Sequence, residues 1–330
     1  MTQHKAQHPT NRGKPNYGFA GLVSFLRTPV CHDLDQLDAD IAVMGAPTDE
    51  GSPFMPGSRF GSRSIREQSL RFGANGVGYF DHDTNKVFLE YELDNNRIVD
   101  VGDADVVPAD VEGTFENITN LTRMVLDSGA MPVVIGGDHA ITFPVVRAYN
   151  KPLHVVHFDA HIDYSPFVHG YEYTNSHAFR HIHHMDHVKS LTQVGIRSVR
   201  NNKAWIDDSI NDGNRVIGMK EFGEMGPNGM TELVPKDASI YVSIDIDVLD
   251  LPLVPGCVSA EPNGMSYAEL RDSLARLASH AEIIGFDLVE VNPQLDVGTG
   301  ITSYMGAHTI MEFMGQICDQ PRWVAKRGKL

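Results

Sequence analysis

Aspartate and histidine side chains gather in three short stretches of the sequence. One stretch ends in Gly-Gly-Asp-His at 136–139, another reads Asp-Ala-His-Ile-Asp at 159–163, and the third reads Asp-Ile-Asp at 245–247. Because residues two apart in an extended chain point to the same side, the polar side chains within a stretch can converge on one point. The candidate ligands are His139, Asp159, His161, Asp163, Asp245 and Asp247.

Such a set of side chains is suited to divalent cations. Four buried carboxylates cannot stay ionised together without compensating positive charge, which two divalent ions would supply. Oxygen and nitrogen ligands without a thiolate suit Mn²⁺, Ni²⁺, Co²⁺ or Fe²⁺ better than a structural zinc. Two bridged ions would lie about 3.5–4 Å apart and generate hydroxide at neutral pH. A lone Asp-x-Asp is often a cap or a solvated turn, but three clusters together predict a binuclear metal site.

Each cluster directly follows a short apolar run, and two further runs of this kind occur elsewhere. The five runs cover 41–44, 132–135, 153–158, 239–244 and 282–288. Nearly continuous apolar runs are typical of parallel strands buried on both faces. Helical patterns lie between them, one capped by Thr114 and ended by Gly129, and one opened by a capping box at Ser266. The alternation predicts an α/β fold in which helices cover both faces of a parallel sheet and ligands gather at the carboxyl ends of its strands.

The overall composition narrows the possible functions. Lys and Arg number 27 against 43 Asp and Glu, a net charge of −16, so no nucleic-acid partner is expected. No apolar run approaches the ~20 residues that span a bilayer, so no membrane partner is expected either. The three cysteines include no Cys-x-x-Cys pair and favour a reducing compartment, the cytoplasm. Residues 1–16 are polar and lack the apolar core of a signal peptide, so we expect a flexible tail followed by one domain over 17–330.

The three clusters resemble the signatures of the ureohydrolase (arginase/agmatinase) family, in particular its agmatinase-like branch. The resemblance extends beyond them to 56–61, 195–197 and 285–291. It implies a three-layer α/β/α fold with a mostly parallel central sheet, and hydrolysis of a guanidino compound to urea and an amine. It also implies a homotrimer or homohexamer, with a hetero-oligomer containing a paralogous chain as the alternative.

The same resemblance implies a role for each candidate ligand. His139 and Asp163 would hold one ion, His161 and Asp247 would hold the other, and Asp159 and Asp245 would bridge them. Mn²⁺ is the leading metal and Ni²⁺ the alternative. Asp163 would also position the nucleophile.

Two further residues correspond to catalytic positions of the family. Glu290 matches the glutamate that binds the guanidinium, a planar cation that a carboxylate can hold with directional hydrogen bonds. His177 matches a histidine thought to transfer a proton, which suits a group that titrates near neutrality. The family usually has glycine after this histidine, whereas this chain has Ala178.

The substrate is expected to carry no carboxylate on its tail. The stretch 164–179 is rich in aromatic residues and contains no Lys or Arg, and we expect it to line the pocket mouth. Phe54 and Met55 would add an apolar wall, while Arg197 or Arg200 could reach in from the next strand end. Agmatine is favoured, and the alternatives are free guanidine, an N-alkylguanidine, a biguanide, or a guanidino acid such as 4-guanidinobutyrate.

Two hypotheses from other classes remain open at this stage. One is a deacetylase-like amidohydrolase, which would use one zinc and fewer ligands. The other is a non-catalytic subunit that keeps the fold, whose sign would be missing ligands. All six candidate ligands are present in this chain.

Overall fold

The central element of the computed structural model is an eight-stranded sheet in the order β4-β1-β5-β10-β9-β6-β7-β8, with every pairing parallel. The structure describes residues 17–72 and 78–327, so the tail predicted over 1–16 lies outside the described residues. The strands are β1 Ile41–Ala46, β4 Ile98–Asp103, β5 Met131–Gly136, β6 Leu153–Phe158, β7 Val188–Ile196, β8 Arg215–Gly218, β9 Ser239–Asp245 and β10 Glu282–Val289. A separate antiparallel pair joins β2 Tyr79–Asp81 to β3 Lys86–Phe88.

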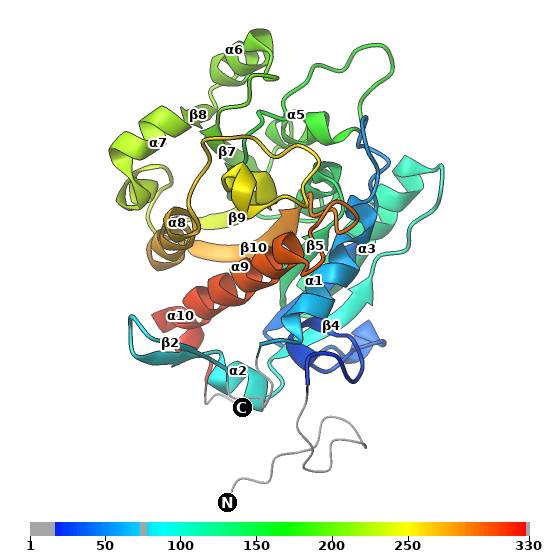
Figure 1. Ribbon diagram of the computed structural model, residues 1–330, viewed down its shortest axis with the longest axis vertical. Helices are drawn as coiled ribbons and strands as arrows, with labels where there is room; N and C mark the ends of the chain where they lie inside the picture. The colour runs from blue at the N-terminus through cyan, green and yellow to red at the C-terminus, as the bar shows by residue number, and fades with distance from the viewer. Residues whose placement is uncertain (1–16, 73–77, 328–330) are drawn as a thin grey trace, which may run out of the picture.

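Helices cover both faces of this sheet (Figure 1). They are α1 Gly61–Ser69, α2 Glu90–Asp94, α3 Val111–Asp127, α4 Thr142–Val146, α5 Ala178–His183, α6 Lys203–Asn211, α7 Met219–Met225, α8 Tyr267–His280, α9 Ile301–Cys318 and α10 Pro321–Val324. Apolar residues of α1, α8 and α9 pack on one face, while those of α3, α4 and α5 pack on the other. The predicted three-layer α/β/α fold is confirmed.

The strand sequences explain why the sheet is buried on both faces. In β1, Ile41 and Val43 join the core beneath α1 and α9, whereas Ala42 and Met44 join the core beneath α3. Alternation of this kind requires apolar residues at consecutive positions, which is the pattern that predicted the strand. All five predicted runs fall on strands, namely β1, β5, β6, β9 and β10.

The predicted helices are also present, with one boundary displaced. The capping box of α8 is formed by Ser266 and Glu269, as expected. α3 begins earlier than the predicted cap at Thr114, because the side chain of Asp110 accepts a hydrogen bond from the backbone N–H of Gly113. Asp110 therefore caps the helix, and Thr114 is buried in its first turn.

Four neighbouring strands carry the predicted site. β5, β10, β9 and β6 are consecutive in the sheet, and the clusters follow the carboxyl ends of β5, β6 and β9. Glu290 follows the end of β10, which lies between β5 and β9. Parallel strands end at one edge of a sheet, so all these residues meet there.

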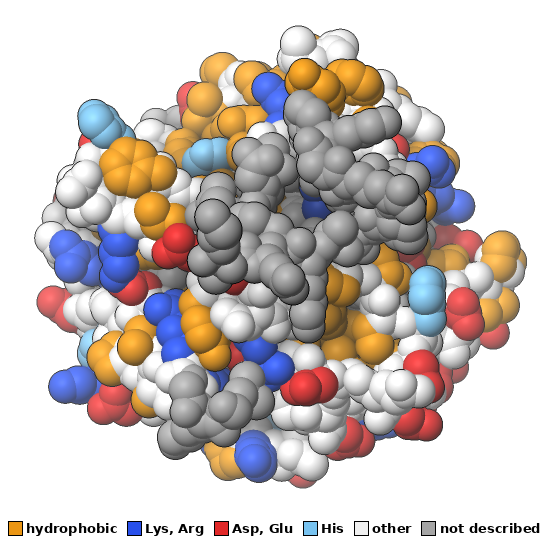
Figure 2. Space-filling model, turned by 90° about the horizontal axis from the view of Figure 1, so that it is seen from below, with side chains coloured by type: hydrophobic (Ala, Val, Ile, Leu, Met, Phe, Trp, Pro, Cys, Tyr) orange, Lys and Arg blue, Asp and Glu red, His pale blue; other side chains and the backbone are white. Residues whose placement is uncertain are grey.

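The surface of the molecule mixes acidic and basic side chains. Among the described residues, no helix combines the length and apolar character needed to cross a membrane. Figure 2 shows acidic and basic side chains interspersed over one face of the molecule, outside the atoms drawn in grey, rather than a continuous basic stripe.

Candidate metal centre

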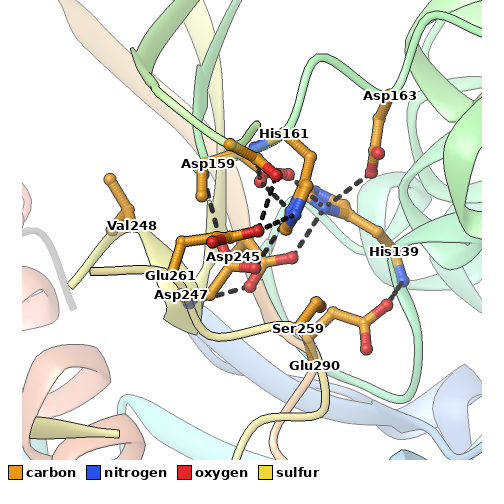
Figure 3. Close-up of polar contacts among 12 residues, drawn as sticks. His139, Asp159, His161, Asp163, Asp245, Asp247, Val248, Ser259, Glu261 and Glu290 are labelled. Atoms are coloured by element: carbon orange, nitrogen blue, oxygen red, sulfur yellow. Dashed lines mark hydrogen bonds and ion pairs between the residues drawn. The ribbon is translucent and has the colours of Figure 1, made fainter. Parts of the chain in front are cut away.

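The six predicted ligand residues come together at the carboxyl edge of the sheet (Figure 3). His139 Nδ1 lies 3.0 Å from Asp159 Oδ2, 3.2 Å from Asp245 Oδ2 and 3.3 Å from Asp163 Oδ2. On the other side, His161 Nδ1 lies 3.2 Å from Asp159 Oδ1 and 3.1 Å from Asp247 Oδ2. Asp159 therefore contacts both histidines, which is the position expected of a bridging carboxylate.

Backbone hydrogen bonds orient three of the acids. Asp245 Oδ1 accepts from the backbone N–H of Asp247 at 2.8 Å, and Asp159 Oδ1 accepts from that of His161 at 2.5 Å. Asp247 Oδ1 accepts from the backbone N–H of Ala160 at 3.0 Å, which ties the loop after β9 to the loop after β6. The second oxygens of Asp245 and Asp247 thus face the histidines, whereas both oxygens of Asp159 do so.

A polar network fixes the protonation of the His139 ring. Ser243 Oγ donates to Asp287 Oδ1 at 2.7 Å, so it must accept from His139 Nε2, which lies 2.9 Å away. His139 therefore carries a proton on Nε2 and directs Nδ1 at the acids. Nδ1 is buried without a hydrogen-bond partner among the described residues, and so is Asp247 Oδ2. Buried atoms of this kind need a partner, and a cation fits both.

His157, one position before the end of β6, supports Asp159. The Gln193 amide N–H donates to His157 Nδ1 at 3.1 Å, so His157 Nε2 carries the proton and donates to Asp159 Oδ2 at 2.8 Å. Burial lowers the pKa of His157 to about 4, which keeps the ring neutral. His157 lies in the run predicted as a strand, and no role in the site was predicted for it. Its spacing of two from Asp159 nevertheless places both side chains on one side.

The electrostatics of the acids favour an added cation. Burial, followed by the charge of Asp247, raises the pKa of Asp245 well above its ordinary value. Burial and the charge of Asp159 raise the pKa of Asp163 in the same way. Ionised carboxylates in these positions are therefore unfavourable unless a positive charge compensates them. The donor set of carboxylate oxygens and imidazole nitrogens fits divalent transition metals.

Glu290 lies beside the ligand cluster. It is buried, and its Oε1 accepts from the backbone N–H of His139 at 3.0 Å and from the Asn175 amide at 3.3 Å. Burial raises its pKa. Glu290 and Asp163 both adopt positive φ, 66° and 43°, a conformation that non-glycine residues seldom take. Two acids of the site are thus held in unfavourable backbone geometry.

A cavity of about 150 Å³ opens over these acids. Its lining includes His161, Asp163, Asp245 and Glu290 at the base, with Ser52, Pro53, Phe54, Met55, Ile162, Asn175, Ser176, Arg200, Asn201, Trp205, Val258 and Ser259 around them. The expected apolar wall of Phe54 and Met55 is confirmed. Trp205, from α6, joins that wall and was not anticipated.

The expectation that the aromatic residues of 164–179 line the pocket mouth is wrong. Only Asn175 and Ser176 of this stretch reach the cavity. Tyr164 is buried and donates to Asp212 Oδ2, and Tyr173 stacks on His181. Tyr164, Phe167 and Tyr173 contact histidine rings of α5, whereas Tyr171 is exposed, and local sequence does not reveal these uses.

His177 is not among the residues that line the cavity. It is buried, its Nδ1 lies 2.7 Å from Thr174 Oγ1, and its ring stacks on Phe167. Burial lowers its pKa, so the neutral ring is favoured. The structure thus places Glu290 in the lining of the cavity, whereas His177 is not part of that lining.

The two arginines considered in the sequence have different surroundings. Arg197 donates to the backbone carbonyls of Asp247 and Glu261, so it braces loops. Arg200 lines the cavity, donates through Nε to Glu261 Oε1 at 2.9 Å, and has a side chain that is 56% exposed. The pocket therefore contains a cation.

Comparison with known proteins indicates the family in which this fold occurs. The sequence profile of the Arginase family matches residues 39–315. Proclavaminate amidinohydrolase of Streptomyces clavuligerus is 34% identical over 310 residues, covering 90% of this chain and 94% of that protein. Guanidinopropionase of Pseudomonas aeruginosa is 33% identical over 307 residues, covering 90% and 92%. The solved structure of the S. clavuligerus enzyme superimposes with a TM-score of 0.80 at 31% identity, covering 91% and 98%.

Fold, site and relatives together define a hydrolase that acts on the carbon–nitrogen bonds of guanidino compounds. Within that class, the chain belongs to the Arginase family. This membership excludes the deacetylase-like alternative, and the enzymatic nature of the relatives disfavours a non-catalytic subunit.

Proposed function

We propose that this ureohydrolase uses two divalent ions, held by the six clustered residues, to hydrolyse a guanidino compound whose tail carries no second positive charge. The observation that carries the metal assignment is His139 Nδ1, a ring nitrogen that is buried without a hydrogen-bond partner among the described residues and faces three carboxylate oxygens at 3.0–3.3 Å. Mn²⁺ is the first candidate, because carboxylates dominate the donor set, and Ni²⁺ is the alternative. The division of ligands between the two ions follows the family resemblance.

Two divalent ions held by these residues would supply hydroxide at neutral pH. Asp163, at the base of the cavity, would orient the attacking nucleophile toward the guanidinium carbon. Glu290 would bind the guanidinium and disperse its charge, since its Oε1 is already oriented by the His139 backbone and Asn175. His177 stays the proposed proton donor to the leaving amine on the strength of the resemblance alone, because its ring faces Thr174 and Phe167.

The outer part of the cavity carries the substrate proposal. Among the described residues around it, Arg200 is the charged side chain, while Phe54, Met55 and Trp205 offer apolar and aromatic surface. A second ammonium, as in agmatine, would meet Arg200, and the acid nearest to that arginine, Glu261, is already paired with it at 2.9 Å. Agmatine, favoured from the sequence, therefore falls behind guanidino acids and N-alkylguanidines or biguanides. The names of guanidinopropionase and proclavaminate amidinohydrolase agree with an acid tail.

Steady-state urea release decides among these substrates. Guanidinopropionate, 4-guanidinobutyrate, an N-alkylguanidine, a biguanide and agmatine are compared with the enzyme loaded separately with Mn²⁺ and Ni²⁺. We expect agmatine to have the lowest kcat/KM of the set. A clear preference for agmatine would contradict the role given to Arg200 in the pocket.

The remaining proposals concern assembly and context. We propose one domain over 17–330, a homotrimer or homohexamer with a paralogue-containing hetero-oligomer as the alternative, and a cytoplasmic location. These rest on composition and on the family resemblance. Light scattering coupled to size exclusion measures the assembly, and co-purification from the native host would reveal a second chain.

A further inference from the structure

The two ring nitrogens of His161 face different surroundings. Nδ1 points at the acids of the ligand cluster, whereas Nε2 points away from it, toward the loop that follows β9. On that far side, Arg200 Nη2 lies 3.0 Å from Nε2 and Glu261 Oε1 lies 3.7 Å from it. Figure 3 shows Glu261 reaching toward the ring.

Metal binding through Nδ1 decides which of these two neighbours can be the partner of Nε2. An imidazole that binds a cation through Nδ1 carries its proton on Nε2, so Nε2–H is a donor. The Arg200 guanidinium also has only donors, and two donors cannot form a hydrogen bond. Glu261 is an acceptor, and it would need to approach by about 0.8 Å to reach ordinary N–H···O length.

Glu261 is already held in a suitable orientation. Its Oε1 accepts from Ser198 Oγ at 2.6 Å and from Arg200 Nε at 2.9 Å. The backbone of the same residue is fixed by Arg197, whose Nη2 donates to the Glu261 carbonyl at 2.8 Å.

We propose that Glu261 is a positioning residue: it accepts a hydrogen bond from His161 Nε2–H and so fixes the ring for binding a divalent ion through Nδ1. Arg200 gives up its Nη2 contact with the ring and keeps its Nε bond to Glu261. The inference rests on the proposed function, since it takes His161 as a metal ligand. Nothing in the ligand cluster itself would otherwise orient the outer edge of this ring.

Titration of metal-free protein with Mn²⁺, followed by calorimetry, tests the inference without using activity. Carboxylates that orient a ligating histidine typically contribute 10–100-fold in metal affinity. We therefore expect Glu261→Leu to weaken the binding of one of the two ions by about 10–100-fold and to leave the other unchanged. Glu261→Gln, which keeps an acceptor oxygen, should lose far less.

Arg200→Leu and the double variant Arg200→Leu/Glu261→Leu separate hydrogen bonding from simple charge. Removing Arg200 alone should not weaken metal binding, because a nearby positive charge is lost. The double variant removes a net-neutral pair, so an effect of charge alone would restore wild-type affinity. The proposal instead requires the double variant to stay as weak as Glu261→Leu.

Three results would overturn the proposal: unchanged affinity in Glu261→Leu, restored affinity in the double variant, or a loss in Arg200→Leu equal to that in Glu261→Leu. Circular dichroism and the melting temperature of the metal-free proteins check the fold, and Glu261→Ala replaces Glu261→Leu where leucine disturbs the loop. Wild-type protein that binds no Mn²⁺ or Ni²⁺ would instead contradict the proposed function itself, so the two failures are distinct.

Discussion

The proposed metal centre has two halves that are built differently. The inner half is His139 with Ser243 and Asp287, and the outer half is His161 with Arg200 and Glu261. His139 is fully buried, and its far nitrogen contacts a serine whose own proton is already committed to Asp287. The His161 side chain is 16% exposed, and its far nitrogen faces a guanidinium.

The difference follows from the elements that supply each half. Ser243 belongs to β9 and Asp287 to β10, so the inner half is fixed by the register of the sheet. Tyr241 and Thr142 also donate to Asp287, which leaves the network little freedom. Arg200 and Glu261 lie on loops that also shape the pocket. The inner half is thus fixed by the sheet, whereas the outer half depends on two loops outside it.

Removing a shared carboxylate should abolish the distinction between the halves. Asp245 lies 3.2 Å from His139 Nδ1 and holds the backbone of Asp247, so it serves both sides. In Asp245→Ala we expect loss of both ions and near-complete loss of urea release, measured by elemental analysis and steady-state kinetics. Unchanged metal content and turnover would refute the ligand assignment. Asp127→Ala, at an exposed position at the end of α3, is a suitable control.

His177 tests whether catalysis needs a residue outside both halves. If it donates a proton, His177→Asn should retain both ions and lose about 10²–10⁴-fold in kcat. Loss of metal would mean that His177 is a ligand. Full activity would agree with its position outside the cavity lining. It would show that His177 is not the proton donor.

The inner half should show a combined effect on metal and stability. In Ser243→Ala, His139 Nε2–H and Asp287 each lose a buried partner, which should cost about 1–3 kcal/mol in the unfolding free energy of metal-free protein. Binding of one ion should weaken by about 10–100-fold. Glu261→Leu should affect the ion without this loss of stability, as measured by urea unfolding. Equal destabilisation in both variants would contradict the expected difference in stability between the two halves.

The smallest effect is expected at the pocket wall. Trp205 borders the cavity without contacting the ligand cluster, so Trp205→Ala should leave the metal content unchanged. Loss of its aromatic surface should raise KM by about 10-fold, with little change in kcat, because one buried contact surface contributes on the order of 1–3 kcal/mol. A fall in kcat with constant KM would show that Trp205 acts in the transition state.

The sequence predicted the strand-borne part of this site and only some of the loop-borne part. Asp159, Asp245 and Glu290 stand next to apolar strands, so their convergence follows from the parallel sheet alone. Arg200 was one of two arginines expected to reach the cavity, and the sequence did not distinguish them, whereas Trp205 reaches it through helix packing that no local pattern encodes. His157 was within reach of prediction, because its spacing from Asp159 is the spacing used for the ligands themselves.

For the aromatic stretch 164–179, the sequence predicted a role in the pocket that the structure does not show. Its composition was taken as evidence for a pocket wall, yet Tyr164 and Tyr173 are engaged in packing and hydrogen bonding elsewhere. Aromatic residues stabilise a core as readily as they line a cavity. Only the path of the backbone decides between these uses.

The left-handed backbone at Asp163 and Glu290 has a consequence for directed evolution. Residues held in this conformation cost on the order of 1–3 kcal/mol each, and glycine or asparagine would relieve much of that cost. A library of variants sorted only for heat resistance would therefore enrich glycine or asparagine at these two positions while discarding turnover. Sorting that alternates heat challenge with urea release would keep both acids, and the improvements would then have to arise elsewhere in the chain.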